Sequence, residues 1–304
     1  MSHIPVLAQE VLKALQPAHA GRVIDGTLGL GGHAALLLEA GAQEVLGLDL
    51  DTTVLEQAKE NLAQYGQRVH IVHTSYVDMA AEAYRLGWDC VDGILLDLGV
   101  SSLQLDVPER GFAFRHDGPL DMRFDPQGSR LPASELVNRL DEAELADIFF
   151  EYGEERFSRK IARVIVAGRP YHTTRELAEQ VEHALPRRRE DKIHPATRIF
   201  QALRIAVNDE LSTIEQTLPD AIRLLKPGGR LAVISFHSLE DRIVKQAFKR
   251  ESTDCICPPK TPVCVCGHKA SVRLVSRKPI EATQEEIARN PRSRSAKLRV
   301  VEKL

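Results

Sequence analysis

A glycine-rich loop near the N-terminus constrains the fold of this chain more than any other feature. An apolar run at residues 22–24 ends in Asp25, and glycine then occupies positions 26, 29, 31 and 32. Apolar residues recur at helical spacing from there to Gly41. A strand, a glycine loop and a helix in this order open a nucleotide- or nucleoside-binding α/β unit, because glycine lets the backbone turn sharply and lets a ligand lie against it.

Two carboxylates indicate which class of nucleotide or nucleoside ligand the loop would bind. Asp49 ends a second apolar run, about twenty residues after the loop, where a carboxylate can hold the two hydroxyls of a ribose. Asp25 precedes the glycines directly, where it would repel a pyrophosphate and attract a cation such as the ammonium group of a methionine. These positions favour S-adenosylmethionine over a dinucleotide. The alternatives are a turn residue for Asp25 and a helix N-cap for Asp49.

Strand and helix patterns alternate up to Asp97. Apolar strands are predicted at 69–72 and 91–96, and a helical stripe lies between residues 54 and 62. The alternation predicts a doubly wound, Rossmann-like parallel sheet. Because ligands bind beyond the carboxyl ends of parallel strands, Asp25, Asp49 and Asp97 are expected to converge on one crevice.

The pattern changes at residue 107, where prolines and glycines interrupt the chain and amphipathic helices follow. These helices are predicted at 142–152, 154–167 and 174–184. We predict an inserted helical substrate-recognition domain over 107–196 and a discontinuous α/β domain over 1–106 and 197–304. The second part of the α/β domain is expected to contain one long helix from residue 197 to 218, a short helix opened by Pro219, a strand at 230–235 and an antiparallel edge hairpin formed by 273–275 and 297–301.

Composition and charge bear on partners. The 304 residues are 43% hydrophobic and 27% charged, with no signal peptide and no membrane-spanning run, which predicts a cytoplasmic protein without a membrane partner. A net charge of −3 argues against nonspecific coating of nucleic acid. Local basic patches fit a structured RNA met at one face, or equally solvated helix faces. The patches contain Arg156, Arg159, Lys160, Arg163, Arg169, Arg187, Arg188 and Arg189, and in the tail Arg273, Arg277, Lys278, Arg289, Arg292, Arg294, Lys297 and Arg299.

Four cysteines stand in two Cys-x-Cys pairs, Cys255 with Cys257 and Cys264 with Cys266, followed by His268. The spacing is shorter than in most zinc motifs, and disulfides are not expected in the cytoplasm. A reduced loop is the favoured interpretation, so no metal is assigned, and a structural zinc is the alternative.

Several longer motifs resemble one protein family, the RsmH (MraW) family of bacterial ribosomal small-subunit RNA cytidine-N4-methyltransferases. The resemblance runs from about His3 to the C-terminus. The motifs are DGTLGLGGH at 25–33, DGILLDLGVSS at 92–102, ERGF at 109–112, GPLDMR at 118–123, YGEER at 152–156, HPATR at 194–198, PGGR at 227–230, SFHSLEDR at 235–242 and NPRSRS at 290–295. The resemblance implies a class I methyltransferase fold, S-adenosylmethionine as the methyl donor, and one cytidine in the decoding region of 16S ribosomal RNA, within the small subunit, as the target.

Site residues follow from the resemblance and from the strand ends. The resemblance implies cofactor contacts at Gly31, Gly32, His33, Asp49, Tyr76, Asp97 and Gln104. Asp97 is the candidate for accepting hydrogen bonds from the cytosine amine, which is a poor nucleophile, and His237 is a second catalytic candidate that could relay a proton. A lone histidine is as often structural. His33 could equally be an exposed first-turn residue, and Tyr76 could stack on adenine or pack in the core.

Alternatives to the enzyme interpretation remain open. Residues 97–101, DLGVS, differ from the Asp/Asn-Pro-Pro-Tyr/Phe motif of many amino-group methyltransferases, although the resembled family shares this difference. A noncatalytic RNA-binding ribosome assembly factor on a methyltransferase scaffold is therefore the rival interpretation. A DNA amino-methyltransferase is a third, although no DNA partner is expected, and a homodimer is left open.

Overall fold

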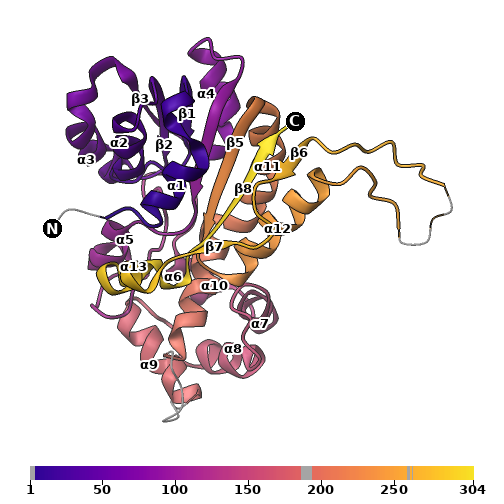
Figure 1. The fold of residues 1–304 in the computed structure, drawn as a ribbon. Helices are drawn as coiled ribbons and strands as arrows, with labels where there is room; N and C mark the ends of the chain where they lie inside the picture. Colours follow the sequence, from indigo (N-terminus) through magenta and orange to yellow (C-terminus); the bar gives the residue numbers. More distant parts are fainter. Residues whose placement is uncertain (1–3, 186–193, 259–260, 262) are drawn as a thin grey trace. The chain divides into compact units, whose positions relative to one another are not determined.

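The computed structural model describes residues 4–185, 194–258, 261 and 263–304. Two compact units make up the chain (Figure 1). Unit 1 comprises the residues up to Gly99 together with Leu211–Leu304, and unit 2 comprises Val100–Glu210. The core of unit 1 lies in two hydrophobic clusters, and that of unit 2 lies in a third.

Unit 1 is built on one mixed sheet in the order β3-β2-β1-β4-β5-β8-β6, with β7 also paired to β8. The first five strands of this order are parallel, and β8 runs antiparallel to β5, β6 and β7. The α/β prediction is confirmed, including the antiparallel edge. The strands are β1 (Arg22–Asp25), β2 (Glu44–Asp49), β3 (Val69–His73), β4 (Val91–Asp97), β5 (Leu225–Ser235), β6 (Val272–Leu274), β7 (Ile280–Glu281) and β8 (Lys297–Lys303).

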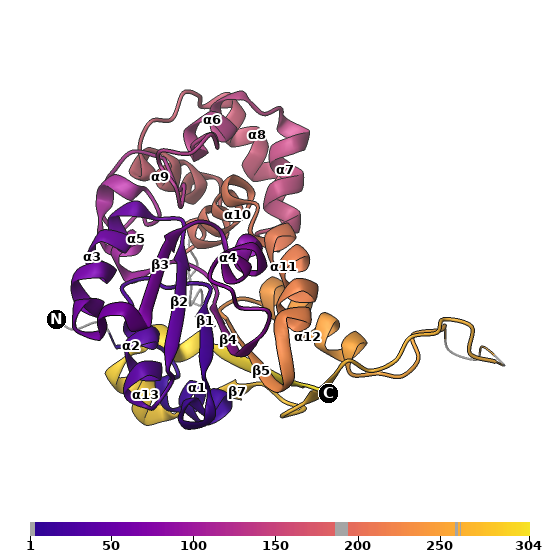
Figure 2. The same cartoon turned by 90° about the horizontal axis from the view of Figure 1, so that it is seen from above.

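Helices cover both faces of this sheet because its strands are apolar on both faces (Figure 2). Successive residues of β1 alternate, with Val23 in the cluster beneath α1, α2 and α3 and Ile24 in the cluster beneath α4, α11 and α12. The helices are α1 (Ala8–Leu15), α2 (Gly32–Glu39), α3 (Thr52–Leu62), α4 (Met79–Arg85), α11 (Glu210–Leu224), α12 (Ser238–Glu251) and α13 (Gln284–Arg289).

Unit 2 is helical. Capping boxes start three of its helices, with Ser101 before α5, Asp141 before α7 and Thr173 before α9. The helix predicted over residues 154–167 begins later, at Ser158. Glu154 adopts a left-handed φ of 49°, which a helix does not allow. The helices are α5 (Ser102–Asp106), α6 (Ala133–Arg139), α7 (Glu142–Glu151), α8 (Ser158–Ala167), α9 (Thr174–Ala184) and α10 (Ala196–Asn208).

The division between the units differs from the predicted domain boundaries. It falls after Gly99 and after Glu210, whereas the sequence pattern placed it after residues 106 and 196. The reason at the second boundary is that α10 buries Ile199, Phe200 and Leu203 in the core of unit 2. Helix α10 therefore belongs to the helical unit.

The predicted single helix from residue 197 to 218 is also wrong. Asp209 has a φ of 54°, which ends α10, and α11 begins at the next residue. Pro219 does not open a new helix but lies inside α11. The buried stripe of Ile214, Leu218 and Ile222 continues on both sides of this proline, so packing outweighs the missing backbone hydrogen bond.

Candidate functional site

Four hydrogen bonds hold the glycine loop between β2 and β4 at the carboxyl edge of the sheet. Two of them join the loop backbone to neighbouring strand carbonyls, and two use a side chain. The donor and acceptor pairs are Gly26 N to Leu95 O (2.9 Å), Leu28 N to Leu48 O (2.8 Å), Gly29 N to Asp49 Oδ2 (2.8 Å) and Asp97 N to Thr27 Oγ1 (2.6 Å). The loop is thus fixed before any ligand arrives.

Two positions in this loop have no room for a larger side chain. Gly31, the N-cap of α2, has a φ of 83°, and a Cβ there would lie 2.7 Å from Cδ1 of Leu62. A Cβ on Gly26 would lie 2.6 Å from Cδ2 of Leu96. Gly32 is the first residue of α2, so the amide end of this helix starts at the loop.

Asp25 is a buried carboxyl group at the tip of β1, with 1% of its surface exposed. Oδ1 accepts a hydrogen bond from the Thr27 amide at 3.2 Å, while buried Oδ2 has no hydrogen-bond partner among the described residues. Burial raises the pKa of Asp25 to about 6, and the neighbouring carboxylates Asp97 and Asp49 add to this shift. His33 and the Thr27 amide act in the opposite direction.

His33 and Asp97 form an ion pair beside Asp25. Nε2 of His33 lies 3.6 Å from Oδ2 of Asp97. His33 is only 7% exposed, so the alternative of an exposed first-turn histidine is wrong. Burial by itself disfavours the imidazolium, but Asp97 and Asp25 outweigh it and raise the pKa of His33. The other oxygen of Asp97, Oδ1, is buried without a hydrogen-bond partner in the described part of the chain.

Asp49 lies at the end of β2 and is half-buried. Its Oδ2 accepts from Gly29 N at 2.8 Å and its Oδ1 accepts from Asp51 N at 3.0 Å, yet burial still raises its pKa. The N-cap of α3 is Asp51, whose side chain accepts from the amides of Thr53 and Val54, so the N-cap alternative for Asp49 is wrong. A carboxylate has about four acceptor positions, so Asp49 keeps capacity for a ribose hydroxyl.

Tyr76 and Gln104 remain predictions as cofactor contacts. Tyr76 follows β3 in a short 3₁₀ helix, Tyr76–Asp78, and its half-buried side chain packs against the cluster beneath α4. Gln104 belongs to unit 2, where its side chain and that of Ser101 form the capping box of α5.

His237 is the N-cap of α12, two residues after the end of β5. Its Nε2 lies 3.1 Å from Oε1 of Glu240, and its Nδ1 accepts from the Glu240 amide at 3.5 Å. This capping box gives the ring a structural role, and a catalytic role for His237 stays a prediction.

The predicted basic patches contain both exposed and paired residues. In unit 2, Arg156, Arg159, Lys160 and Arg163 are all exposed, and Nε of Arg163 lies 3.3 Å from Oε1 of Glu142. Arg169 donates to the Val137 carbonyl at 2.7 Å and to the Leu140 carbonyl, so it supports the fold. The run 187–189 lies outside the described residues.

Several arginines of the tail are engaged inside unit 1. Arg299 donates to both carboxylate oxygens of Asp241, at 2.7 and 3.1 Å, and Arg273 pairs with Glu302. These arginines hold the antiparallel edge of the sheet, which the sequence pattern did not reveal.

The pairing of His33 with Asp97 is the feature of the site that sequence reasoning missed. Both residues were candidates, but no local spacing links a residue in the first turn of a helix to the end of a strand far along the chain. The signal lay in the topology, because β1 and β4 are neighbours in the sheet.

Known proteins resemble this chain over its whole length. A model of the MraW methylase family matches residues 1–304. A protein named ribosomal RNA small subunit methyltransferase H from Nitratidesulfovibrio vulgaris is 52% identical over 309 residues, covering 99% of this chain and 86% of the relative. A protein of the same name from a Geobacter species is 53% identical over 308 residues, covering 99% and 98%. The crystal structure of an rRNA methylase from Streptococcus thermophilus aligns with a TM-score of 0.46 at 9% identity, covering 100% and 99%.

Proposed function

This chain belongs to the MraW methylase family, and from that premise we propose that it transfers a methyl group from S-adenosylmethionine to N4 of a cytidine in the decoding region of 16S ribosomal RNA. The match of the family model to residues 1–304 carries the proposal. The full-length relatives named ribosomal RNA small subunit methyltransferase H support ribosomal RNA of the small subunit as the substrate.

The strand-end site fits the proposed cofactor. Asp25 offers a buried carboxylate oxygen without a partner among the described residues, which suits the ammonium group of a methionine. Asp49 can accept from ribose hydroxyls, and Gly31 keeps side chains away from the loop backbone. When bound, S-adenosylmethionine supplies a methyl group on a positively charged sulfur.

Asp97 is the residue best placed to act on the amine. The lone pair of cytosine N4 is delocalised into the ring, so the attacking nitrogen gains positive charge as its bond to the methyl carbon forms. The bond from that carbon to sulfur breaks at the same time and its electron pair stays on sulfur, after which the nitrogen gives up one proton to water. A carboxylate that accepts hydrogen bonds from this amine stabilises that charge. His33 lies against Oδ2 of Asp97, which leaves Oδ1 as the atom for the amine. We assign His33 as a positioning residue for Asp97.

A methylation assay tests the function. The purified protein is incubated with labelled S-adenosylmethionine and small ribosomal subunits that lack the modification, and the labelled base is mapped. Label at one cytidine of the 16S RNA is expected. Absence of label, with S-adenosylmethionine binding intact by calorimetry, would contradict the proposed reaction. Absence of binding as well would favour the noncatalytic assembly factor, and label in duplex DNA would favour a DNA methyltransferase.

The Asp97→Asn variant tests the assigned role of the carboxylate. Because the amide is uncharged, we expect the rate constant of methyl transfer at saturating cofactor to fall by about tenfold or more. The pKa of His33, followed by NMR, should also fall, since Asp97 helps to raise it. The hydrogen bond that the backbone amide of residue 97 donates to Thr27 Oγ1 does not involve the replaced group and should be kept. Normal turnover would remove Asp97 from the chemistry.

The proposed partner is ribosomal RNA within the small subunit, met in the cytoplasm. None of the described helices combines the length and the apolar composition that a membrane span requires. Small subunits and their assembly intermediates are both candidate substrates, and the methylation assay run on each will distinguish them.

A further inference from the structure

The chain between α12 and β6 leaves the sheet of unit 1 as an extended arm (Figures 1 and 2). Hydrogen bonds close the base of this arm, with Ser271 N donating to Glu251 O at 2.8 Å and Ala270 N donating to Asp254 Oδ1 at 3.2 Å. The arm has apolar side chains but does not bury them. Ile256, Val263 and Val265 are 43%, 72% and 83% exposed. Hydrophobic packing of these residues therefore does not explain how the arm is held together.

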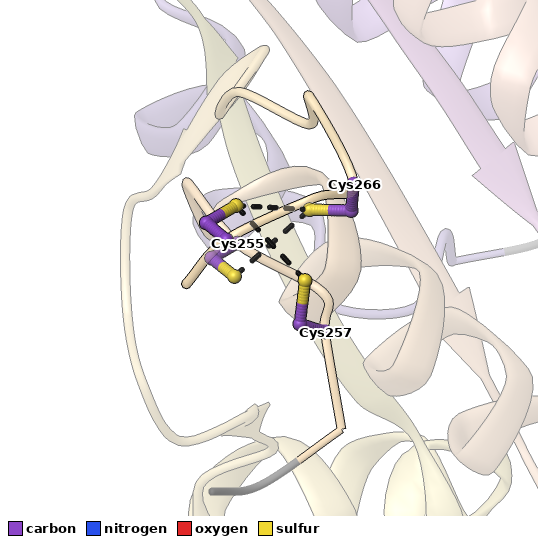
Figure 3. A group of neighbouring side chains, drawn as sticks. Cys255, Cys257 and Cys266 are labelled. Carbon is purple, nitrogen blue, oxygen red and sulfur yellow. Dashed lines mark hydrogen bonds between the residues drawn. The ribbon is translucent and has the colours of Figure 1, made fainter. Parts of the chain in front are cut away.

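Four cysteine thiols face one another across the arm; Figure 3 labels Cys255, Cys257 and Cys266. Cys255 and Cys257 come from the outgoing segment, and Cys264 and Cys266 come from the returning one. Neighbouring sulfurs are 3.5, 3.9 and 4.0 Å apart, and all four lie within 4.8 Å of one another. These distances are too long for a disulfide, in which the sulfurs are about 2.05 Å apart, and the cysteines are free.

The spacing of the sulfurs matches a tetrahedral metal site. Zinc lies about 2.3 Å from a cysteine sulfur, which gives a sulfur–sulfur edge of about 3.8 Å in a regular tetrahedron. The three neighbouring distances of 3.5–4.0 Å fall on either side of that value.

The surroundings define which residues are the ligands. The Ile256 amide donates to Sγ of Cys266 at 3.4 Å, the kind of contact that orients a thiolate ligand and stabilises its charge. Nε2 of His268 lies 2.9 Å from the carbonyl oxygen of Arg250, so that nitrogen is engaged away from the sulfurs. The ligand set is the four cysteines without the histidine.

We propose that Cys255, Cys257, Cys264 and Cys266 bind one Zn²⁺ ion that ties the two segments of the arm together. A tetrahedral set of four thiolates has no open coordination position, which assigns the ion a structural rather than a catalytic role. We therefore prefer a structural zinc site to the reduced, metal-free loop that the short Cys-x-Cys spacing favours. The geometry of the folded arm, rather than the spacing along the chain, brings the two pairs together. The inference is independent of the proposed methyl transfer.

Metal analysis of the purified full-length protein tests the site. We expect about one zinc per chain, lost in the double variant Cys264→Ser, Cys266→Ser and kept in Cys90→Ser, which alters an exposed cysteine outside the cluster. Replacement by Co²⁺ should produce the absorption bands of tetrahedral thiolate coordination. Circular dichroism and S-adenosylmethionine binding check that the double variant has folded, because Asp25, Asp49 and the glycine loop lie outside the arm.

Limited proteolysis gives a second readout. Zinc should protect residues 252–271 from cleavage, and a chelator should make this segment sensitive while the rest of unit 1 stays resistant. Protein freshly purified without reductant or chelator that holds no metal would overturn the proposal. Iron in place of zinc, or a disulfide between these cysteines, would overturn it too.

Discussion

At the scale of single residues, Asp25 is a buried group whose charge state couples the stability of the fold to pH. Its pKa rises from 3.8 to about 6 in the folded protein because burial disfavours the carboxylate. The folded state therefore favours the neutral form. The contribution of Asp25 to the free energy of unfolding is therefore most favourable below about pH 4. It decreases between about pH 4 and about pH 6 and stays at the lower value above that. His33, Asp97 and Asp49 are the charged neighbours that modulate this titration.

The Asp25→Asn variant follows from this linkage. An amide stays neutral, so the ligand-free variant should be more stable than the native chain by about 1–3 kcal/mol at about pH 7.5, with the gain shrinking as the pH falls from about 6 to about 4. Urea unfolding of both proteins at about pH 7.5 and at about pH 4 measures the difference in unfolding free energy. S-adenosylmethionine should bind the variant more weakly at about pH 7.5, because its ammonium group loses a carboxylate. An equal stability gain at both pH values would contradict the assignment.

The Asp49→Ala variant tests the ribose contact. We expect S-adenosylmethionine to bind about 1–3 kcal/mol more weakly, the contribution of charge-assisted hydrogen bonds to the ribose hydroxyls. Asp89→Ala is the matched control, because Asp89 is exposed and precedes β4 at the opposite edge of the sheet. Calorimetry should give native affinity for the control. Unchanged affinity in Asp49→Ala would show that the ribose is held elsewhere.

At the scale of elements, the glycine loop acts as a preformed part of the site because strands β2 and β4 hold it on both sides. Its conformation depends on Gly31, which has a left-handed φ of 83° and where an added Cβ would overlap the side chain of Leu62. Comparison with a second glycine separates the effect of backbone strain from that of side-chain overlap. Gly87 has a φ of 73°, and a Cβ added to it would have nothing within 4 Å.

Alanine at these two positions should therefore have different effects. Gly87→Ala should cost about 1–2 kcal/mol of unfolding free energy for the left-handed backbone alone. Gly31→Ala should cost more, about 2–4 kcal/mol, because its Cβ would also overlap Leu62. It should weaken S-adenosylmethionine binding as well, whereas Gly87→Ala should not. Denaturant unfolding and calorimetry measure the two quantities. Equal losses of stability would contradict the overlap.

At the scale of the whole molecule, the exposed basic residues of unit 2 are the candidates for RNA contact. Arg156, Arg159 and Lys160 are exposed, whereas Arg163 and Arg169 have partners within the unit. Replacing Arg156, Arg159 and Lys160 with glutamine should weaken binding to the small subunit. For each phosphate that is no longer bound, the slope of log affinity against log salt should become shallower by about 0.7–0.9.

Affinity for S-adenosylmethionine should be unchanged in this triple variant, which separates RNA binding from cofactor binding. Lys13→Gln with Lys59→Gln, on helices α1 and α3 of unit 1, is the control. The same measurement is made on a variant with glutamine at Arg187, Arg188 and Arg189. For this run the prediction of RNA contact comes from the sequence alone. If neither set changes the salt dependence, the basic tail is the next surface to examine.

Local patterns in the sequence were sufficient to locate the first four strands and three helices of unit 2. Alternating apolar runs located β1, β2, β3 and β4, and the cap residues Asp141 and Thr173 precede the helices predicted at 142–152 and 174–184. Periodicity and capping depend on neighbours within a few residues, which is why they can be read from the chain. The strand-end positions of Asp25, Asp49 and Asp97 followed from the same reasoning.

Tertiary contacts decided what local pattern could not. The burial of His33 against Asp97, the break at Asp209 and the convergence of two cysteine pairs each depend on residues that are distant in sequence or on packing into a core. Pro219 shows the same point, since its place inside α11 reflects an apolar face buried on both sides of it. Propensity is a weak local preference, and burial of apolar surface in the folded chain outweighs it.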